Sequence, residues 1–202
     1  MSGMEIASYL MVVVYVISFL AMSAILAREA GRPVWLFGKG GEKQALPALL
    51  FKLAFAGAVI WPLLLAAFGN PITNDPLHAA LDGPWYDVLG HLLVVIGACV
   101  ALLSQRYMGT SWRIGAAEGE QGAIVDSGPF AISRNPVFLG QALLFIVLPS
   151  LVQAGLTLAL LIAIRLQVAI EERVLAASLG QPYLAYRARV RRWLGVTRQL
   201  PA

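Results

Sequence analysis

Long apolar segments separated by short polar ones run along most of the chain. Three of these segments, residues 7–27, 45–68 and 85–105, are each long enough to cross a bilayer as a helix, which takes about 20 residues. The first segment carries no charge and no small-residue cleavage pattern follows it, so we expect a retained helix rather than a signal peptide. The pattern therefore predicts three membrane-spanning helices in the first half of the protein.

A fourth apolar region, residues 136–164, carries no charge and is too long for a single crossing. The stretch LPSLVQAG at its middle combines proline, serine, glutamine and glycine, which favour a turn. We expect a helical hairpin with two short arms there. The fold predicted for the whole chain is all-α: a polytopic integral membrane protein with about five transmembrane helices, this C-terminal helical hairpin and a small cytoplasmic cap.

Composition and charge agree with a membrane protein. Of the 202 residues, 59% are hydrophobic and only 13% are charged, a balance outside the usual range of soluble domains. Lysine and arginine collect in cytoplasmic loops, and here they occur after the first and third helices but not in residues 68–85. The expected location is a bacterial inner membrane, with the N-terminus outside and the C-terminus in the cytoplasm. The net charge of +4 then reflects topology and contact with membrane lipids, not a nucleic-acid partner.

A polar group of side chains precedes the hairpin. Proline is favoured at the first position of a helix, so Asn135 is expected to be the N-cap of a helix that begins at Pro136. The N–H groups at such a helix end, together with the Arg134 guanidinium, suit an anion such as a carboxylate or a phosphate. Gly140, one turn further on, leaves room for a group to approach the backbone. The alternative is that Arg134 and Asn135 only anchor an interfacial helix end.

Two adjacent carboxylates, Glu171 and Glu172, mark the predicted end of the fifth helix. Acids oppose the dipole at a helix C-terminus, so we expect them to hold a cationic group while Arg134 holds an anionic one. A solvated helix end is the alternative for these glutamates. Arg165, seven residues before Glu172, is expected on the same helix face, where a structural ion pair is the alternative to a functional role.

The C-terminal segment predicts one more helix. Gly180 can end one helix and Pro182 can begin the next. Apolar side chains then recur at helical spacing among arginines: Tyr183, Tyr186, Val190, Trp193 and Leu194. This pattern is typical of an amphipathic helix on the inner membrane surface. A plain membrane anchor and a lid over a bound ligand are both compatible with it.

Five short motifs, taken in order, resemble the isoprenylcysteine carboxyl methyltransferase family, which is related to the phospholipid methyltransferases. They are MGTSWRIG (108–115), IVDSGPF (124–130), RNPVFLG (134–140), the glutamate pair (171–172) and LGQPYLAYRARVRRWL (179–194). The resemblance divides a single membrane domain, residues 1–202, into three N-terminal helices (1–105) and a methyltransferase-like region with a cytoplasmic cofactor pocket (106–202). It implies S-adenosylmethionine as the cofactor and a lipid-like or prenylated small molecule as the methyl acceptor.

The resemblance also implies a set of cofactor-binding residues: Gly128, Arg134, Asn135, Pro136, Phe138, Gly140, Glu171 and Glu172. Asn135 stands where the family usually has histidine, and Phe138 where it usually has tyrosine. Asparagine keeps hydrogen bonds but does not take up or release a proton at neutral pH. If the family's histidine acts as an acid or a base, that role is absent here or belongs to another residue. Arg134 and then Arg165 are the expected catalytic residues, because aligning an acceptor carboxylate requires no base.

Alternatives to this function stay open. An amine acceptor, as in phospholipid N-methylation, must lose a proton, and the motifs offer no base beyond the two glutamates. A sterol-type reductase that uses NADPH is similar to the C-terminal region, and a non-catalytic membrane scaffold is a third alternative. Trp112 and Arg113 are expected to line the pocket or to anchor the interface, whereas His91 is expected to be packed or hydrogen-bonded. The spacing of histidine, cysteine and carboxylate side chains suggests no metal site.

Overall fold

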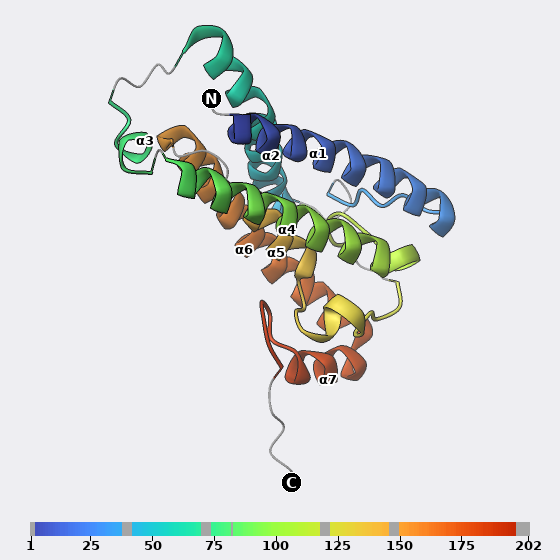
Figure 1. Ribbon diagram of the computed structural model, residues 1–202. Helices are drawn as coiled ribbons and strands as arrows, with labels where there is room; N and C mark the ends of the chain where they lie inside the picture. The colour runs from blue at the N-terminus through green and yellow to red at the C-terminus, as the bar shows by residue number, and fades with distance from the viewer. Residues whose placement is uncertain are drawn as a thin grey trace.

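Helices make up most of the chain in this computed structural model (Figure 1). The structure describes residues 3–37, 42–69, 74–81, 83–117, 122–145 and 150–196. The α-helices of these ranges are α1 (Gly3–Ala30), α2 (Ala45–Phe68), α3 (Pro76–Leu81), α4 (Pro84–Met108), α5 (Pro136–Leu144), α6 (Leu151–Leu179) and α7 (Gln181–Arg189). Short 3-10 turns lie at Glu42–Gln44, Gly109–Ser111 and Gly128–Ala131. Bridges of the β type are isolated in the described chain, so the all-α prediction is confirmed.

Four helices are long and apolar enough to cross a membrane: α1, α2, α4 and α6. The three N-terminal predictions are therefore confirmed, and α2 begins and ends at the predicted residues, Ala45 and Phe68. The first arm of the predicted hairpin forms α5, which has 9 residues and is shorter than the roughly 20 that a full crossing takes. Within the described ranges, the bundle thus combines four long helices with a short one.

The two arms of the predicted hairpin form α5 and α6 and are unequal in length. The predicted turn over residues 148–155 begins outside the described residues, and its second part, from Leu151, belongs to α6. The hydroxyl of Ser150 caps α6 by accepting a hydrogen bond of 3.1 Å from the backbone N–H of Gln153, as expected for serine at an N-cap. α6 then runs for 29 residues to Leu179 and ends, as predicted, at Gly180, whose φ is 58°. The prediction that the glutamate pair closes this helix is wrong, because the good helix formers after Glu172 extend it by about two turns.

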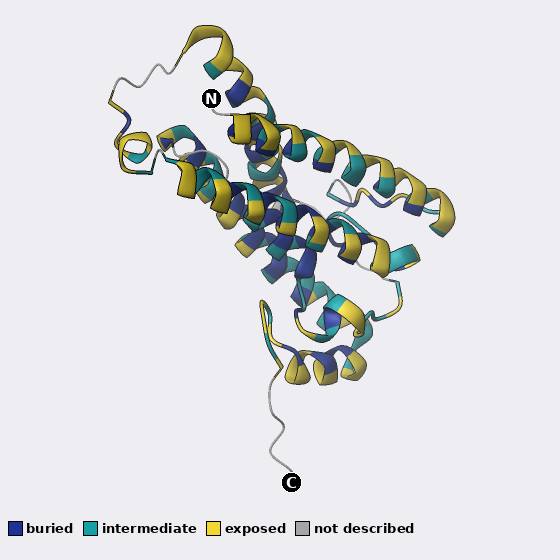
Figure 2. Cartoon of the chain, in the orientation of Figure 1, coloured by how far each residue is buried: buried dark blue, intermediate teal, exposed yellow. Residues whose placement is uncertain are grey.

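The helices pack into one bundle in which α4 lies against α1 and α5, and α2 lies against α6. Figure 2 shows exposed residues along the outer faces of α1 and α4. Many of these residues are large and apolar, among them Leu10, Ile17 and Leu103. A broad apolar surface of this kind marks contact with a membrane, which agrees with the hydropathy of the four long helices.

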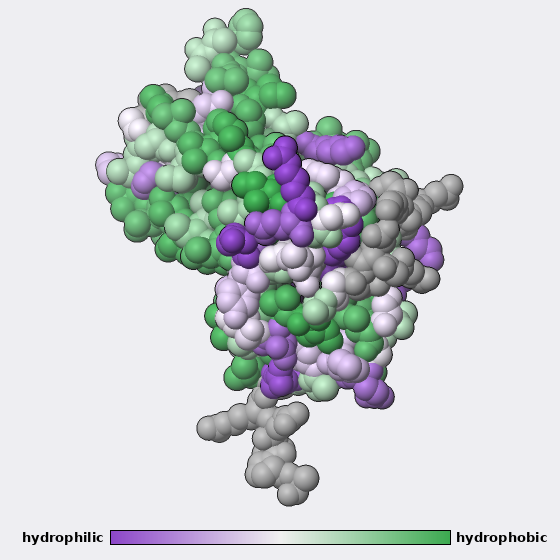
Figure 3. Space-filling model, turned by 90° about the vertical axis from the view of Figure 1, so that its right-hand side faces the viewer, coloured by the Kyte–Doolittle hydropathy of each residue, from purple (hydrophilic) through white to green (hydrophobic). Residues whose placement is uncertain are grey.

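A small cap, made of residues 122–135 and 180–196, lies at one end of the bundle (Figure 1). Its own apolar cluster joins Phe130 to Tyr183, Tyr186 and Val190. In Figure 3 apolar surface dominates the upper part of the molecule, and polar side chains gather in the middle and lower parts. This distribution separates a membrane-facing bundle from a polar end that contains the cap.

The helix predicted through Leu194 is shorter than expected. α7 ends at Arg189, and the N–H of Arg191 donates a 2.9 Å hydrogen bond to the carbonyl of Gly195. Gly195 has a φ of 106°, a conformation that closes a turn and that glycine adopts readily. Trp193 and Leu194 are therefore exposed in a turn and do not extend a helical face.

Candidate functional site

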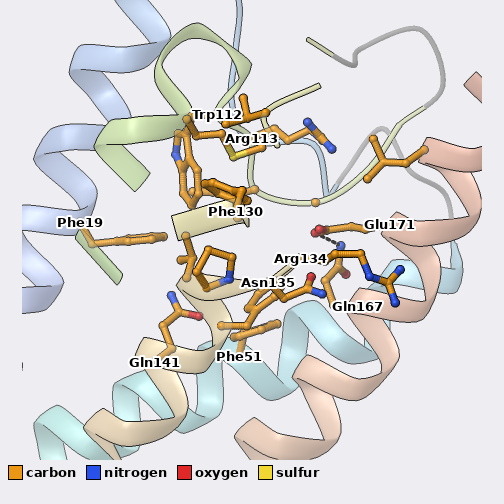
Figure 4. A pocket seen from close by; sticks show the side chains of 18 of the residues that line it. Phe19, Phe51, Trp112, Arg113, Phe130, Arg134, Asn135, Gln141, Gln167 and Glu171 are labelled. Atoms are coloured by element: carbon orange, nitrogen blue, oxygen red, sulfur yellow. Dashed lines mark hydrogen bonds between the residues drawn. The ribbon is translucent and has the colours of Figure 1, made fainter. Parts of the chain in front are cut away.

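A cavity of about 550 Å³ lies where the bundle meets the cap, and Figure 4 shows the side chains around it. Its walls come from both halves of the chain, because α1 and α2 contribute as well as α5, α6, α7 and the loops between them. Aromatic rings form one part of the wall, and charged side chains form another. The region 106–202 therefore encloses this cavity only together with the N-terminal helices.

The aromatic part of the wall is held in place by contacts between helices. Phe51 of α2 stacks on Phe138 of α5, with ring centroids 5.7 Å apart. Phe19 of α1 meets Trp112 edge to face at 5.6 Å. The indole N–H of Trp112 also donates a 3.1 Å hydrogen bond to the hydroxyl of Ser23. These contacts satisfy the polar edge of Trp112 and leave apolar ring surface towards the cavity.

The segment that carries Trp112 and Arg113 is fixed by backbone pairing and by one buried glutamine. The N–H of Ile114 donates to the carbonyl of Val34 at 2.7 Å. The side-chain amide of Gln44 both donates to and accepts from the backbone of Ala116, at 2.6 and 2.8 Å. Arg113 and Trp112 line the cavity, which is one of the two alternatives that the sequence left open for this pair.

Arg113 and Glu171 bring opposite charges to the same wall. Burial lowers the pKa of Arg113, and the nearby Glu171 carboxylate partly opposes that change. An arginine remains protonated even so. The Glu171 carboxylate accepts a 2.9 Å hydrogen bond from the amide of Gln167 (dashed in Figure 4). Within the described chain this is its only side-chain hydrogen bond, so Glu171 keeps acceptor capacity on the cavity side.

Glu172 differs from its neighbour because both of its oxygens are already paired. Arg192 donates to the two carboxylate oxygens at 3.1 and 2.6 Å, and Nη1 of Arg134 lies 2.8 Å from Oε1. The hydrogen bonds with Glu172 raise the pKa of Arg192. Only 8% of the Glu172 side chain is exposed. The ion cluster Arg134–Glu172–Arg192 therefore joins α6 to the cap. Both glutamates line the cavity, but Glu172 is already paired with two arginines, whereas Glu171 is not hydrogen-bonded to any described arginine.

Arg134 is central to this ion cluster and also lines the cavity. Its side chain is 10% exposed. Its Nε and Nη1 atoms make no hydrogen bond with the described residues, although Nη1 is in ion-pair contact with Glu172. The backbone N–H of Arg134 donates to the carbonyl of Arg191 at 3.1 Å. Arg134 thus has buried donors that a bound anion would satisfy.

Asn135 occupies the predicted N-cap position of α5, but its side chain does not cap the helix. The side-chain amide donates a 3.1 Å hydrogen bond to the carbonyl of Arg192 instead. This carbonyl lies within hydrogen-bonding distance because the backbone N–H of the neighbouring Arg134 is hydrogen-bonded to the carbonyl of Arg191. Asn135 therefore fastens α5 to the C-terminal turn while still lining the cavity.

The other residues predicted from the resemblance fall into two groups. Pro136 and Phe138 line the cavity. Gly128 and Gly140 serve packing instead: a Cβ at Gly128 would lie 2.6 Å from the Tyr107 ring, and α4 occupies the space beside Gly140. Arg165 is exposed on α6 and does not line the cavity. Its predicted catalytic role is unsupported by position: Arg165 shares a helix face with Glu172, as expected for residues seven apart in a continuous helix, but two turns earlier on α6 this face is exposed and lies away from the cavity.

Several residues that line the cavity were not among the site residues predicted from the sequence. They lie in the N-terminal helices or inside apolar segments, and they include Tyr15, Phe19, Phe51, Lys52 and Gln141. Polar side chains within membrane-spanning segments are uncommon and are often functional, so Gln141 offered a usable signal. The aromatic residues offered none, because their types and spacing are also those of ordinary helix packing. His91 accepts or donates a 3.1 Å hydrogen bond with Ser8, so it is hydrogen-bonded as predicted.

Comparison with protein-family models, with curated proteins and with solved structures finds no match to this chain. Among the described residues there is also no group of histidine, cysteine and carboxylate side chains that could hold a metal ion.

Proposed function

We propose that this protein is a membrane methyltransferase that uses S-adenosylmethionine to modify a lipophilic acceptor. The observation that carries the proposal is a single cavity with two kinds of wall, buried ions at one end and aromatic rings at the other. A zwitterionic cofactor and an apolar acceptor would each find a suitable surface there. The five motifs that resemble isoprenylcysteine carboxyl methyltransferases support the same function.

The charged residues fit the groups that S-adenosylmethionine carries, namely a carboxylate, an ammonium and a sulfonium. Glu171 is the carboxylate available to a cationic group, because Glu172 is occupied by two arginines. The buried guanidinium of Arg134 has donors without hydrogen bonds, which suits a carboxylate. The cavity volume of about 550 Å³ lies within the roughly 300–1,000 Å³ that is usual for ligand pockets.

When bound, this cofactor would supply an electrophilic methyl group. The chain itself contributes position, charge and the removal of water. Arg113 and Arg134 would align the carboxylates of the cofactor and of a carboxylate acceptor, and such an acceptor needs no general base. An amine acceptor would have to lose a proton, for which Glu171 is the available carboxylate on the cavity wall.

The rings of Tyr183 and Tyr186 separate the ionic end from the outside of the cap. Burial, followed by the charge of Glu172, raises the pKa of Tyr183, so its phenol stays neutral at physiological pH. Tyr186 donates a 2.8 Å hydrogen bond to the carbonyl of Phe130. These two neutral side chains close the wall without adding charge, which keeps water away from the ions.

Calorimetric titration of S-adenosylmethionine into the purified protein, in detergent and in lipid, tests the proposal. Wild type should bind, and Glu171→Gln should bind at least about tenfold more weakly, since it removes one charged partner. Arg165→Ala is the matched control, because it removes a charge from the exposed face of α6 and should leave binding unchanged. Absence of binding to wild type in both media would refute the proposal, and thermal stabilisation by NADPH alone would favour a reductase.

A further inference from the structure

The aromatic end of the cavity contains one polar pair, Tyr15 of α1 and Gln141 of α5. The side-chain amide of Gln141 donates a 2.9 Å hydrogen bond to the hydroxyl of Tyr15. Both residues line the cavity, and they are only 1% and 4% exposed. Phe19 and Phe55 pack around Tyr15, with ring centroids 5.8 and 6.3 Å away. Figure 4 shows Gln141 on the side of the cavity opposite Arg134.

Tyr15 and Gln141 have hydrogen-bonding groups that no other described residue pairs with. Oε1 of Gln141 is buried and has no hydrogen-bond partner there. The hydroxyl of Tyr15 accepts a hydrogen bond from Gln141, and no side chain or carbonyl of the described residues accepts its proton. A buried polar atom without a partner is destabilising, so such atoms in native proteins are usually met by water or by a ligand.

The orientation of the glutamine amide narrows the chemistry of the missing partner. If the amide is turned end for end, it accepts a hydrogen bond from Tyr15 and leaves its nitrogen, a donor, without a partner. In the first orientation the pair lacks a donor for Oε1 of Gln141 and an acceptor for the Tyr15 proton, and in the second it lacks an acceptor for the amide nitrogen. A hydroxyl group satisfies both orientations, because it donates and accepts. A plain hydrocarbon chain satisfies neither.

We propose that Tyr15 and Gln141 form a subsite for a hydroxyl group on the apolar part of the lipophilic acceptor. This inference rests on the proposed function, since it takes the apolar ligand of the cavity to be the methyl acceptor. Gln141 lies on the side of the cavity opposite Arg134 (Figure 4). The acceptor is thus a lipid-like molecule whose hydroxyl is separated along the chain from the charged group that faces Arg134.

A fatty-acid series tests the subsite, because the carboxylate suits the ionic end and the chain suits the aromatic end. The probes are hexadecanoic acid and hexadecanoic acids with a single hydroxyl at successive carbons, offered to the protein in nanodiscs. Binding is measured by native mass spectrometry. One position of the hydroxyl should bind about tenfold more tightly than the plain acid. Gln141→Leu and Tyr15→Phe should each reduce that preference to near equality.

Gln105→Leu is the matched control variant. Gln105 is also a buried glutamine whose Oε1 has no partner, but it bonds to Ser23 and Phe19 and does not line the cavity. Its hydroxyl preference should equal that of wild type. The preference is the ratio of the affinities of two ligands, measured on one preparation of protein. Partial loss of folded protein in a variant therefore does not change it. Equal binding at every hydroxyl position, or a preference that survives Gln141→Leu, would overturn the proposal.

The ribose of a nucleoside is the other source of a hydroxyl for this subsite. Adenosine and its dideoxy analogue, compared on wild type and on Gln141→Leu, separate the two sources. If Gln141→Leu abolishes a preference for adenosine, the subsite belongs to the cofactor and the proposal fails. If the protein prefers a hydroxylated fatty acid but does not bind S-adenosylmethionine, the subsite is supported and only the methyltransferase function is refuted. If it binds S-adenosylmethionine but shows no preference for a hydroxylated fatty acid, only the subsite is refuted.

Discussion

Gly97 of α4 and Gly140 of α5 are in contact backbone to backbone. A Cβ added to Gly97 would lie 2.6 Å from the carbonyl oxygen of Gly140, and a Cβ added to Gly140 would lie 2.5 Å from the carbonyl oxygen of Gly97. Real Cβ atoms do not approach a carbonyl this closely. The contact sets the distance of α5 from α4, and α5 carries Phe138 and Gln141 into the cavity wall.

Gly140→Ala should therefore lower the stability of the protein, because the opposing group is backbone and cannot turn away. Overpacking of this kind typically costs about 1–3 kcal/mol. Denaturant unfolding in detergent measures the loss. Gly155→Ala is the control, since Gly155 lies inside α6 with nothing within 4 Å of an added Cβ. This variant should be neutral or slightly more stable, and equal effects at the two sites would contradict the close contact.

Arg192→Ala should loosen the cap from α6. It removes both hydrogen bonds that Arg192 donates to Glu172, and we expect a loss of about 1–3 kcal/mol, because the Arg192 side chain is 30% exposed and the pair is partly screened. Arg189→Ala breaks an ion pair with Asp126 whose partners are about half exposed, so it should cost less than about 1 kcal/mol. A larger effect at Arg189, measured by thermal unfolding, would show that the ion cluster does not fasten the cap.

The two neighbouring glutamates should respond differently to the same substitution. Glu172→Gln leaves the guanidiniums of Arg134 and Arg192 facing each other, so stability should fall by about 2–4 kcal/mol. Glu171→Gln removes a charge that has one hydrogen bond in the described chain, so it should change stability little and mainly weaken S-adenosylmethionine binding. Unfolding and calorimetry on the same preparations separate the two effects. Identical behaviour of the variants would contradict this division of roles.

Asp75 should make stability depend on acid pH. Its carboxylate accepts hydrogen bonds from the backbone N–H groups of Leu77 and His78 in α3 and of Leu151 in α6. Burial acts to raise the pKa of Asp75, but these hydrogen bonds outweigh it and the pKa is lowered from 3.8. A lowered pKa in the folded state means that the stabilisation is present at neutral pH and is lost as the pH falls below about 4.

Asp75→Asn tests this dependence, because asparagine does not titrate. The variant should be less stable than wild type at neutral pH, and the difference should shrink as the pH falls below about 4. Asp126→Asn serves as the control, since it removes the carboxylate of an exposed ion pair. A stability difference between wild type and Asp75→Asn that stays constant with pH would show that the carboxylate charge is not the stabilising feature.

Much of the fold was readable from residue order alone. The apolar segments predicted α1, α2 and α4, and Gly180 marked the end of α6, because helix length and chain breakers act locally. Asn135 and Glu172 show where local rules failed. The asparagine has the right position for an N-cap, and the glutamate was expected to hold a cationic ligand. Both side chains bind the C-terminal turn instead, a partner that lies 57 and 20 residues away in the chain.

The site divides in the same way between sequence and tertiary structure. The sequence by itself determined the membrane bundle and the polar residues Arg134, Asn135 and Glu171, since charged side chains in or beside apolar segments are conspicuous. Only the tertiary structure decided that Arg165 is exposed, that Gly140 packs against α4, and that Tyr15 meets Gln141 across 126 residues. The physical reason is that the face of a helix that borders a cavity depends on which neighbour covers its other faces, and that choice depends on contacts between distant segments.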